Sequence, residues 1–367
     1  MPIYINGNRK IKNIFANVNG KKKSIVSAWV NKNGLPTKVF QIDRGIVDPA
    51  DPYEIAPTSE CNDWSYVLDD ENNIITLKYY KGTKVDVIVY ANYVIGEKIY
   101  KTQIANGVSF GSTYMFSNKA NIKTVKFSDS LDTSNITNMT GMFYYCKNLT
   151  SIDFGENFNT SSVTNMSGMF TQCELLTNLD ISNFSTSHVT NMTQMFANCK
   201  SLEQLDVSNF DTGNVSNMNS MFTGCSTLTG LDLSSFNTCN TISMNNMFTN
   251  NTALEVITFG NNFDTRNVID MSAIFFNCIS LGNLDLSSFN TSNVTIMYSM
   301  FENCTSLAEL DLSSFDTRNV TNMKNMFRNA SNLKTIYATD GIWSTAKAGS
   351  TATYMFYGCG TSSVTYK

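Results

Sequence analysis

One phenylalanine returns along most of this chain at an almost constant distance. The steps are 26 or 27 residues long, and only the final step, of 29, is longer. Leucine, cysteine and a Leu-Asp pair recur with it in one order. A period in the twenties is typical of leucine-rich repeats, whose units bury their apolar faces by stacking. The chain is therefore predicted to be a solenoid of about nine repeats, marked by Phe116, Phe143, Phe170, Phe196, Phe222, Phe248, Phe275, Phe301, Phe327 and Phe356.

Each repeat contains two segments of different periodicity. The Leu-x-x-Leu-Asp-Leu segment alternates like a short strand, so Leu231 and Leu233 should face inward and Asp232 outward. Stacked strands about 4.8 Å apart would form one parallel sheet about 40 Å long. The return segment spaces Met244 from Met247-Phe248 by three and four residues, which indicates a short helical turn. The predicted fold class is thus an α/β repeat solenoid of the leucine-rich-repeat type, preceded by small all-β modules.

Charge and proline usage divide the chain. Residues 1–44 carry nine Lys and Arg against one acid, a net charge of +8, whereas the other 17 basic and 29 acidic residues give −12. Asn-Gly pairs punctuate this basic segment as hairpin turns do. All five prolines precede the repeats. We expect a basic β-meander that docks to a partner at 1–44, a linker at 45–60, a β-rich cap at 61–112, repeats at 113–337 and a C-terminal cap at 338–367.

Nucleic acid is not the partner that the basic segment indicates. Its run Lys21-Lys22-Lys23 lies beside an Asn-Gly turn and lacks the clustered arginine and stacking aromatics of a dedicated binder. A solvated hairpin end, or a face that docks to an acidic partner within a larger assembly, fits the composition better. No apolar run reaches the roughly 18 to 20 residues that cross a bilayer, and the first residues lack the apolar stretch of a secretory signal.

The repeat resembles the BspA-like bacterial surface leucine-rich repeats, in their 26-residue variant. The phrase around Asn191-Met192, Met195-Phe196, Cys199 and Leu205-Asp206 recurs nearly whole, and the likeness covers roughly residues 62–360. It implies an adhesin or interaction protein that binds host or bacterial surfaces and has no shared catalytic residue. Residues 14–20 and 28–34 resemble short β-repeats of phage tail and tail-fibre proteins. With no secretory signal, that second resemblance implies a virion-borne protein assembled in the host cytoplasm; the alternative location is a bacterial cell surface.

Seven cysteines occupy one position of the repeat. Asparagine and alanine replace cysteine there in two units, as Asn251 and Ala330, so the position tolerates substitution. Neighbouring rungs could meet disulfide geometry, but small buried thiols are the expected state. Zinc is disfavoured because its cysteine ligands usually come in closely spaced pairs. The seven are Cys146, Cys173, Cys199, Cys225, Cys278, Cys304 and Cys359.

Outward-facing aspartates form a second column, interrupted by Thr258. Carboxylates stacked this closely should raise some pKa values or attract cations, which makes the column a candidate Ca²⁺ site or a groove for a cationic ligand. The alternative is that each aspartate bonds to neighbouring serines or backbone groups. This column is the predicted ligand-binding site: Asp153, Asp180, Asp206, Asp232, Asp285 and Asp311.

No residue pattern indicates catalysis. The only histidine, His188, takes a position held by asparagine in sister units, and neither a nucleophile elbow nor a glycine-rich phosphate loop occurs. Asparagines before the core methionine, at 138, 165, 191, 217 and 322, are expected to satisfy turn backbone groups. The sequence therefore predicts a non-enzymatic recognition protein for a surface polysaccharide or protein. A bacterial adhesin, or a purely structural spacer with a uniform repeat face, are the alternatives.

Overall fold

The computed structural model describes residues 55–56, 60–108 and 114–367, together with the backbone of five strands near the N-terminus. β2 and β3 form an antiparallel pair, as do β4 and β5, and β1 joins β4 in parallel. The linker predicted at 45–60 lies largely outside the described residues. The five strands are β1 (Tyr4–Ile5), β2 (Phe15–Val18), β3 (Lys21–Ser24), β4 (Ser27–Lys32) and β5 (Leu35–Gln41).

A four-stranded sheet covers the first coil of the solenoid. A 3-10 helix, η1 (Glu60–Asp63), leads into strands ordered β6-β7-β10-β9. Trp64 is almost fully buried, and its ring centroid lies 5.5 Å from that of Phe116, the first repeat phenylalanine. The sheet thereby closes an apolar end that a solenoid would otherwise expose. Its strands are β6 (Trp64–Asp69), β7 (Ile74–Tyr80), β9 (Asn92–Ile95) and β10 (Lys98–Ile104).

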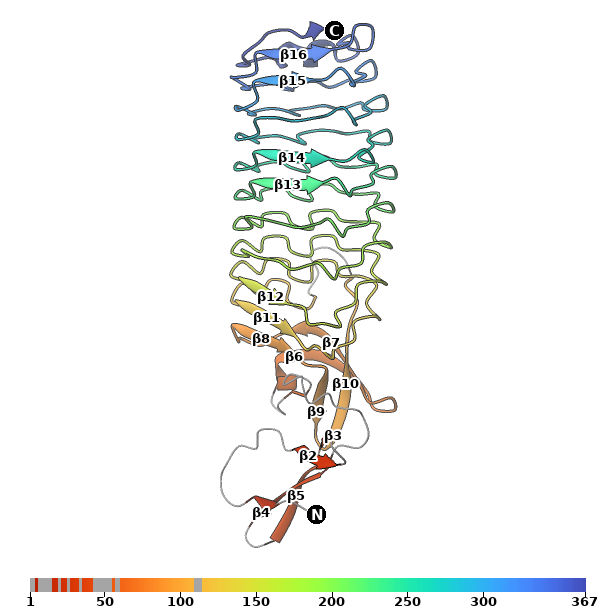
Figure 1. Cartoon of the computed structure of the whole chain (residues 1–367), viewed down its shortest axis with the longest axis vertical. Helices are drawn as coiled ribbons and strands as arrows, with labels where there is room; N and C mark the ends of the chain where they lie inside the picture. The colour runs from red at the N-terminus through yellow and green to blue at the C-terminus, as the bar shows by residue number, and fades with distance from the viewer. Residues whose placement is uncertain are drawn as a thin grey trace.

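Beyond this sheet the chain winds into a regular stack of coils (Figure 1). The described strands of the stack form three short parallel sheets, ordered β12-β11-β8, β13-β14 and β15-β16-β17. The prediction of one continuous nine-rung sheet is therefore wrong, because several coils pass this face in non-strand conformation. The strands are β8 (Asp86–Val89), β11 (Thr124–Phe127), β12 (Ser151–Asp153), β13 (Gly230–Leu233), β14 (Val256–Phe259), β15 (Glu309–Asp311), β16 (Thr335–Ala338) and β17 (Thr365–Tyr366).

The return segments are not helical, so the α/β character predicted for the repeat is wrong. The described residues contain no α-helix, and their only helices are the 3-10 elements η1 and η2 (Gly349–Tyr354). In the coil of Phe222, Ser220 has φ 55° and Gly224 has φ 71°, values that interrupt a right-handed helix. Alternate amides donate instead to carbonyls of the next coil at 2.8–3.0 Å, from residues 218, 220, 222 and 224 to 243, 245, 247 and 249. The fold is a β-solenoid.

The core is a ladder of stacked phenylalanine rings that runs through the whole stack. Ten repeat phenylalanines, from Phe116 to Phe356, form nine consecutive stacks with centroids 5.4–5.9 Å apart and planes within 12° of parallel. Methionines and leucines pack around them, and Met221 and Leu231 are almost fully buried. Each of the eight inner rings therefore contacts the coil before it and the coil after it, which ties the stability of neighbouring repeats together.

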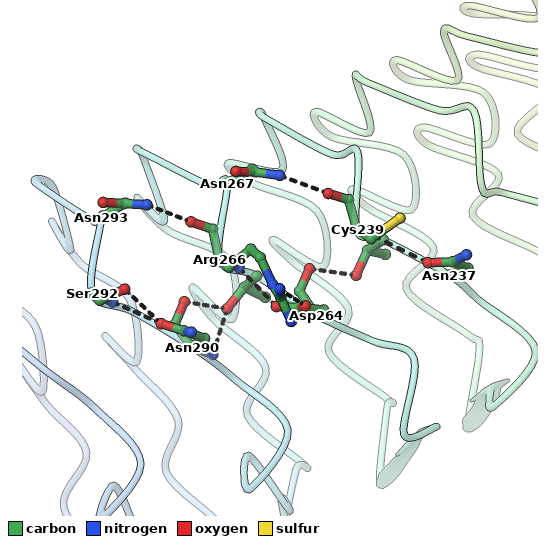
Figure 2. Close-up of polar contacts among 10 residues, drawn as sticks. Asn237, Cys239, Asp264, Arg266, Asn267, Asn290, Ser292 and Asn293 are labelled. Atoms are coloured by element: carbon green, nitrogen blue, oxygen red, sulfur yellow. Dashed lines mark hydrogen bonds and ion pairs between the residues drawn. The ribbon is translucent and has the colours of Figure 1, made fainter.

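A polar corner holds the coils in register on another edge. Thr212 is fully buried, donates its hydroxyl to the Asn237 carbonyl and accepts the Asn237 amide, both at 2.9 Å. Figure 2 shows the neighbouring asparagines, where Asn267 and Asn293 donate their side-chain amides to carbonyls of the preceding coil at 2.7 Å. The threonine position recurs in eight coils, at Thr133, Thr160, Thr186, Thr212, Thr238, Thr265, Thr291 and Thr317.

The cysteine column lies inside the core as free thiols. Six of the seven side chains are fully buried, and each donates S–H to the phenylalanine carbonyl of the preceding coil, as Cys225 does to Phe196 at 3.2 Å. Burial raises the pKa of Cys225 to about 12. Cys359 is partly exposed. The thiols are therefore small core side chains that remain protonated at neutral pH.

Asn251 takes the cysteine position in one coil and is expected to destabilise the core there. It is fully buried, and neither its amide nitrogen nor its carbonyl oxygen has a hydrogen-bond partner. Replacing Asn251 by cysteine should raise the free energy of unfolding by about 1 to 3 kcal/mol, since two unsatisfied polar groups leave the core. Urea unfolding followed by circular dichroism measures the change. Cys199→Ala is the control and should cost about 1 kcal/mol; an Asn251→Cys variant no more stable than the wild type contradicts the assignment.

Candidate ligand-binding face

The predicted aspartate column lies on the outer face of the strand segments. All six carboxylates are exposed, and the paired strands alternate inward and outward residues as expected, with Leu231 beside Ile257 and Asp232 beside Thr258. The structure therefore brings Asp153, Asp180, Asp206, Asp232, Asp285 and Asp311 to one side of the molecule. Because stacked strands lie about 4.8 Å apart, the column offers acidic groups at closely repeated intervals.

Each aspartate of the column is held by a local hydrogen bond. Asp206 accepts the Ser208 amide at 2.9 Å and Asp180 accepts the Ser182 amide at 3.1 Å and its hydroxyl at 2.7 Å. These serine contacts lower the pKa values of both aspartates. The pKa values of Asp153 and Asp311 are lowered as well. The expectation that stacking raises pKa values is wrong for these four, because their hydrogen bonds stabilise the ionised form.

Among the described residues, basic partners of the column lie only at its two ends. Asp153 forms an ion pair with Lys126, and Asp311 forms one with Lys367 at 2.8 Å. Within the part of the chain that the structure describes, the four aspartates between them, Asp180, Asp206, Asp232 and Asp285, have no ion-pair partner. In this part of the chain the middle of the face consequently carries uncompensated negative charge.

Two hollows open on this face near the ends of the column. One, of about 520 Å³, is lined by Asp129, Asp153, Glu156 and Asp180, and the other, of about 450 Å³, by Asp285, Glu309 and Asp311 together with Ser287 and Ser313. The described residues contain no group of three or more His, Cys, Asp or Glu side chains placed to hold one metal ion. Small hydroxyl and amide side chains beside the acids give the face hydrogen-bonding capacity as well as charge.

Other polar residues singled out in the sequence serve the backbone. The Asn191 side chain accepts the Thr193 amide at 3.0 Å, and its equivalents at 138, 165, 217 and 322 do the same, which confirms their expected role. The Nδ1 atom of His188 lies 2.9 Å from the Ser161 carbonyl oxygen. In the next coil Asn214 takes the equivalent position and donates its side-chain amide to the Ser187 carbonyl. The threonine ladder was missed, although its signal, a threonine two residues after a second phenylalanine, recurs in the sequence.

These features define a β-solenoid repeat protein with an acidic strand face. The family model described as "Mycoplasma protein of unknown function, DUF285" matches residues 111–205, 150–260 and 250–366. The chain belongs to this family. The matched ranges cover the repeats and do not include residues 1–44. The family match therefore does not test the resemblance of residues 1–44 to phage tail repeats. Among curated proteins, none matches this sequence.

The solved structures that this chain matches include bacterial leucine-rich repeat proteins. A leucine-rich repeat protein from Bacteroides ovatus is 15% identical, with 83% of this chain and 98% of that chain covered and a TM-score of 0.37. The leucine-rich repeat protein of T. pallidum is 15% identical over 67% and 88% of the two chains, with a TM-score of 0.34. A leucine-rich cell surface protein from Faecalibacterium prausnitzii is 16% identical over 78% and 95%, with a TM-score of 0.29.

Proposed function

We propose that the protein is a non-catalytic recognition protein that binds an extended polysaccharide or protein at a bacterial surface through its acidic strand face. The observation that supports this most is the run of exposed aspartates from Asp180 to Asp285, which have no basic partner within the described ranges 60–108 and 114–367. Self-repulsion of such charges is unfavourable for the fold, so a face that keeps them is suited to a ligand with positive or hydrogen-bond-donating groups. Within the described residues, no helix has the length and apolar character needed to cross a bilayer.

Residues 1–44 are proposed as the docking module that carries this face. Their charge of +8 suits an acidic partner, and their resemblance to phage tail repeats favours a virion as the larger assembly, with a cell surface as the alternative carrier. Replacing the lysines of residues 1–44 by glutamine should prevent the protein from joining the larger assembly. A variant that still joins the assembly would contradict this assignment.

Charge removal on the strand face tests the proposed function. The double variant Asp206→Asn/Asp232→Asn keeps a side-chain oxygen for the serine amides and removes two charges. Retention on purified bacterial envelopes should fall roughly fivefold to tenfold, in line with the modest worth of individual exposed charges. Added salt should weaken wild-type retention in the same direction.

The matched control is Glu71→Gln/Glu97→Gln, which removes two exposed charges from the N-terminal sheet. Equal losses in both variants would show that net charge, rather than the strand face, governs retention. The structural-spacer alternative draws on the uniformity of the face, where Ser234, Ser287 and Ser313 recur. It predicts that the wild type is not retained even at high protein concentration.

A further inference from the structure

An ammonium group already sits at one end of the acidic face. The Nζ atom of Lys367 lies 2.8 Å from a carboxylate oxygen of Asp311 and 3.6 Å from the centroid of the Tyr337 ring. The Tyr337 hydroxyl lies 3.5 Å from Glu309, which borders the same hollow as Asp311. A carboxylate and an aromatic face together form a well-matched environment for a compact cation.

The backbone holds this arrangement in place. Asp311 and Tyr337 are paired neighbours on β15 and β16, and Tyr337 is in turn paired with Thr365 on β17. The Lys367 amide donates to the Ala338 carbonyl at 3.0 Å, so the residue follows the sheet edge and its side chain reaches back across two coils. Asp311, Tyr337 and Glu309 therefore lie on paired strands, whereas Lys367 follows the end of β17.

Lys367 is also the side chain best able to be displaced. About half of its side chain and half of that of Asp311 are exposed to solvent, so neither is buried by the contact. Hydrogen bonds from Lys367 and Ser313 lower the pKa of Asp311 to about 2, which keeps this carboxylate ionised over the whole physiological range. At the opposite end of the column, Lys126 contacts Asp153 from within strand β11 and so belongs to the sheet itself.

We propose that Asp311, Tyr337 and Glu309 form a binding site for a primary ammonium group of the ligand, and that Lys367 occupies it in cis as a displaceable competitor. This rests on the proposed function, since it names the chemical group by which a ligand of the strand face would be held. A ligand with lysine-like amines would replace Lys367 at this end and extend along the unpaired aspartates toward Asp180. An intramolecular group that fills the site about nine-tenths of the time lowers the apparent affinity about tenfold.

The test uses the full chain, tetralysine as the probe and isothermal titration calorimetry at low salt. Lys367→Met keeps an unbranched apolar side chain without the charge, and it should bind tetralysine about tenfold more tightly than the wild type. Adding Tyr337→Leu to Lys367→Met should remove most of that gain. Tetralysine acetylated at its N-terminus and at all four side chains should not bind, because acetylation of every amine removes the ammonium groups.

The outcomes separate this site from the proposed function. If Asp206→Asn weakens tetralysine binding and Lys367→Met changes nothing, the competitor site is overturned while the strand face remains a binding surface. Equal affinity of Lys367→Met with and without Tyr337→Leu also overturns the site. A gain in Lys367→Met that Tyr337→Leu removes, without any effect of Asp206→Asn, supports the site and contradicts the role given to the middle of the column. No binding by any variant overturns the site, and envelope retention then decides the proposed function independently.

Discussion

Replacing Phe222 by alanine should lower the free energy of unfolding by about 3 to 5 kcal/mol. The ring is fully buried between those of Phe196 and Phe248, at centroid distances of 5.6 and 5.9 Å and with interplanar angles of 6° and 1°. Its removal opens a cavity in the middle of the ladder and ends two stacks at once. Since each coil is stabilised mainly by its neighbours, the array should also unfold less cooperatively.

Urea unfolding followed by circular dichroism measures both effects, as a lower midpoint and a smaller slope. Tyr354→Ala is the control, because this aromatic side chain is 56% exposed and lies outside the ladder. It should change the free energy of unfolding by no more than about 0.5 kcal/mol. A loss below about 1 kcal/mol for Phe222→Ala would mean that the ladder does not couple the coils.

The strand segments could be predicted from the sequence because only one periodicity fits them. Leucines on either side of Asp232 predict a strand with one face in the core. In β13, Leu231 and Leu233 are buried and Asp232 is exposed, as this pattern predicts. The continuity of the sheet was not predictable in the same way. Asp180 and Asp206 follow the same motif as Asp232, yet their coils are not strands, so the local pattern does not decide whether neighbouring backbones pair.

The helical turns were predicted wrongly because a spacing of three between buried residues does not distinguish a helix from consecutive turns. Met218, Met221 and Phe222 are buried as expected, but the Met221 amide donates to the Met218 carbonyl across a turn with Ser220 at positive φ. Asparagine and glycine hold the two left-handed positions in many coils, as at Asn246 and Gly224, although Ser220 and Ala273 adopt this conformation too. These residue types tolerate that conformation, so their recurrence was the available signal.

The candidate site was partly predictable. The outward aspartates follow from the strand pattern, because every residue between two buried leucines must face away from the core. The strand pattern does not show which of these aspartates form an ion pair with a basic side chain. Lys367 is 56 positions from Asp311 in the sequence, and only the stacking of β15, β16 and β17 brings the two together. Ion pairs between residues so far apart in the sequence can be predicted only once the fold is known.

The 27-residue coil that leads from Phe248 to Phe275 depends on a glycine where the extra residue is inserted. In the coil of Phe236 the chain passes from Leu233 to Phe236 in three steps, whereas Phe259 and Phe263 are four residues apart. The inserted turn brings Gly260 against the backbone of the preceding coil. A Cβ atom at Gly260 would lie 2.1 Å from the Ser234 carbonyl oxygen and 2.8 Å from its carbon. Both are backbone atoms, so no side-chain rotation relieves the overlap.

Gly260→Ala should therefore lower the free energy of unfolding by about 3 kcal/mol, the upper end for a methyl group forced into a packed site, because two coils must move apart to admit it. Thermal unfolding by calorimetry measures the loss. Gly282→Ala is the matched control in the following repeat, where a Cβ atom meets nothing within 4 Å, and its effect should stay within about 0.5 kcal/mol. Equal stabilities for the two variants would show that the coils of Ser234 and Gly260 are not in close contact, and that the longer repeat is accommodated elsewhere.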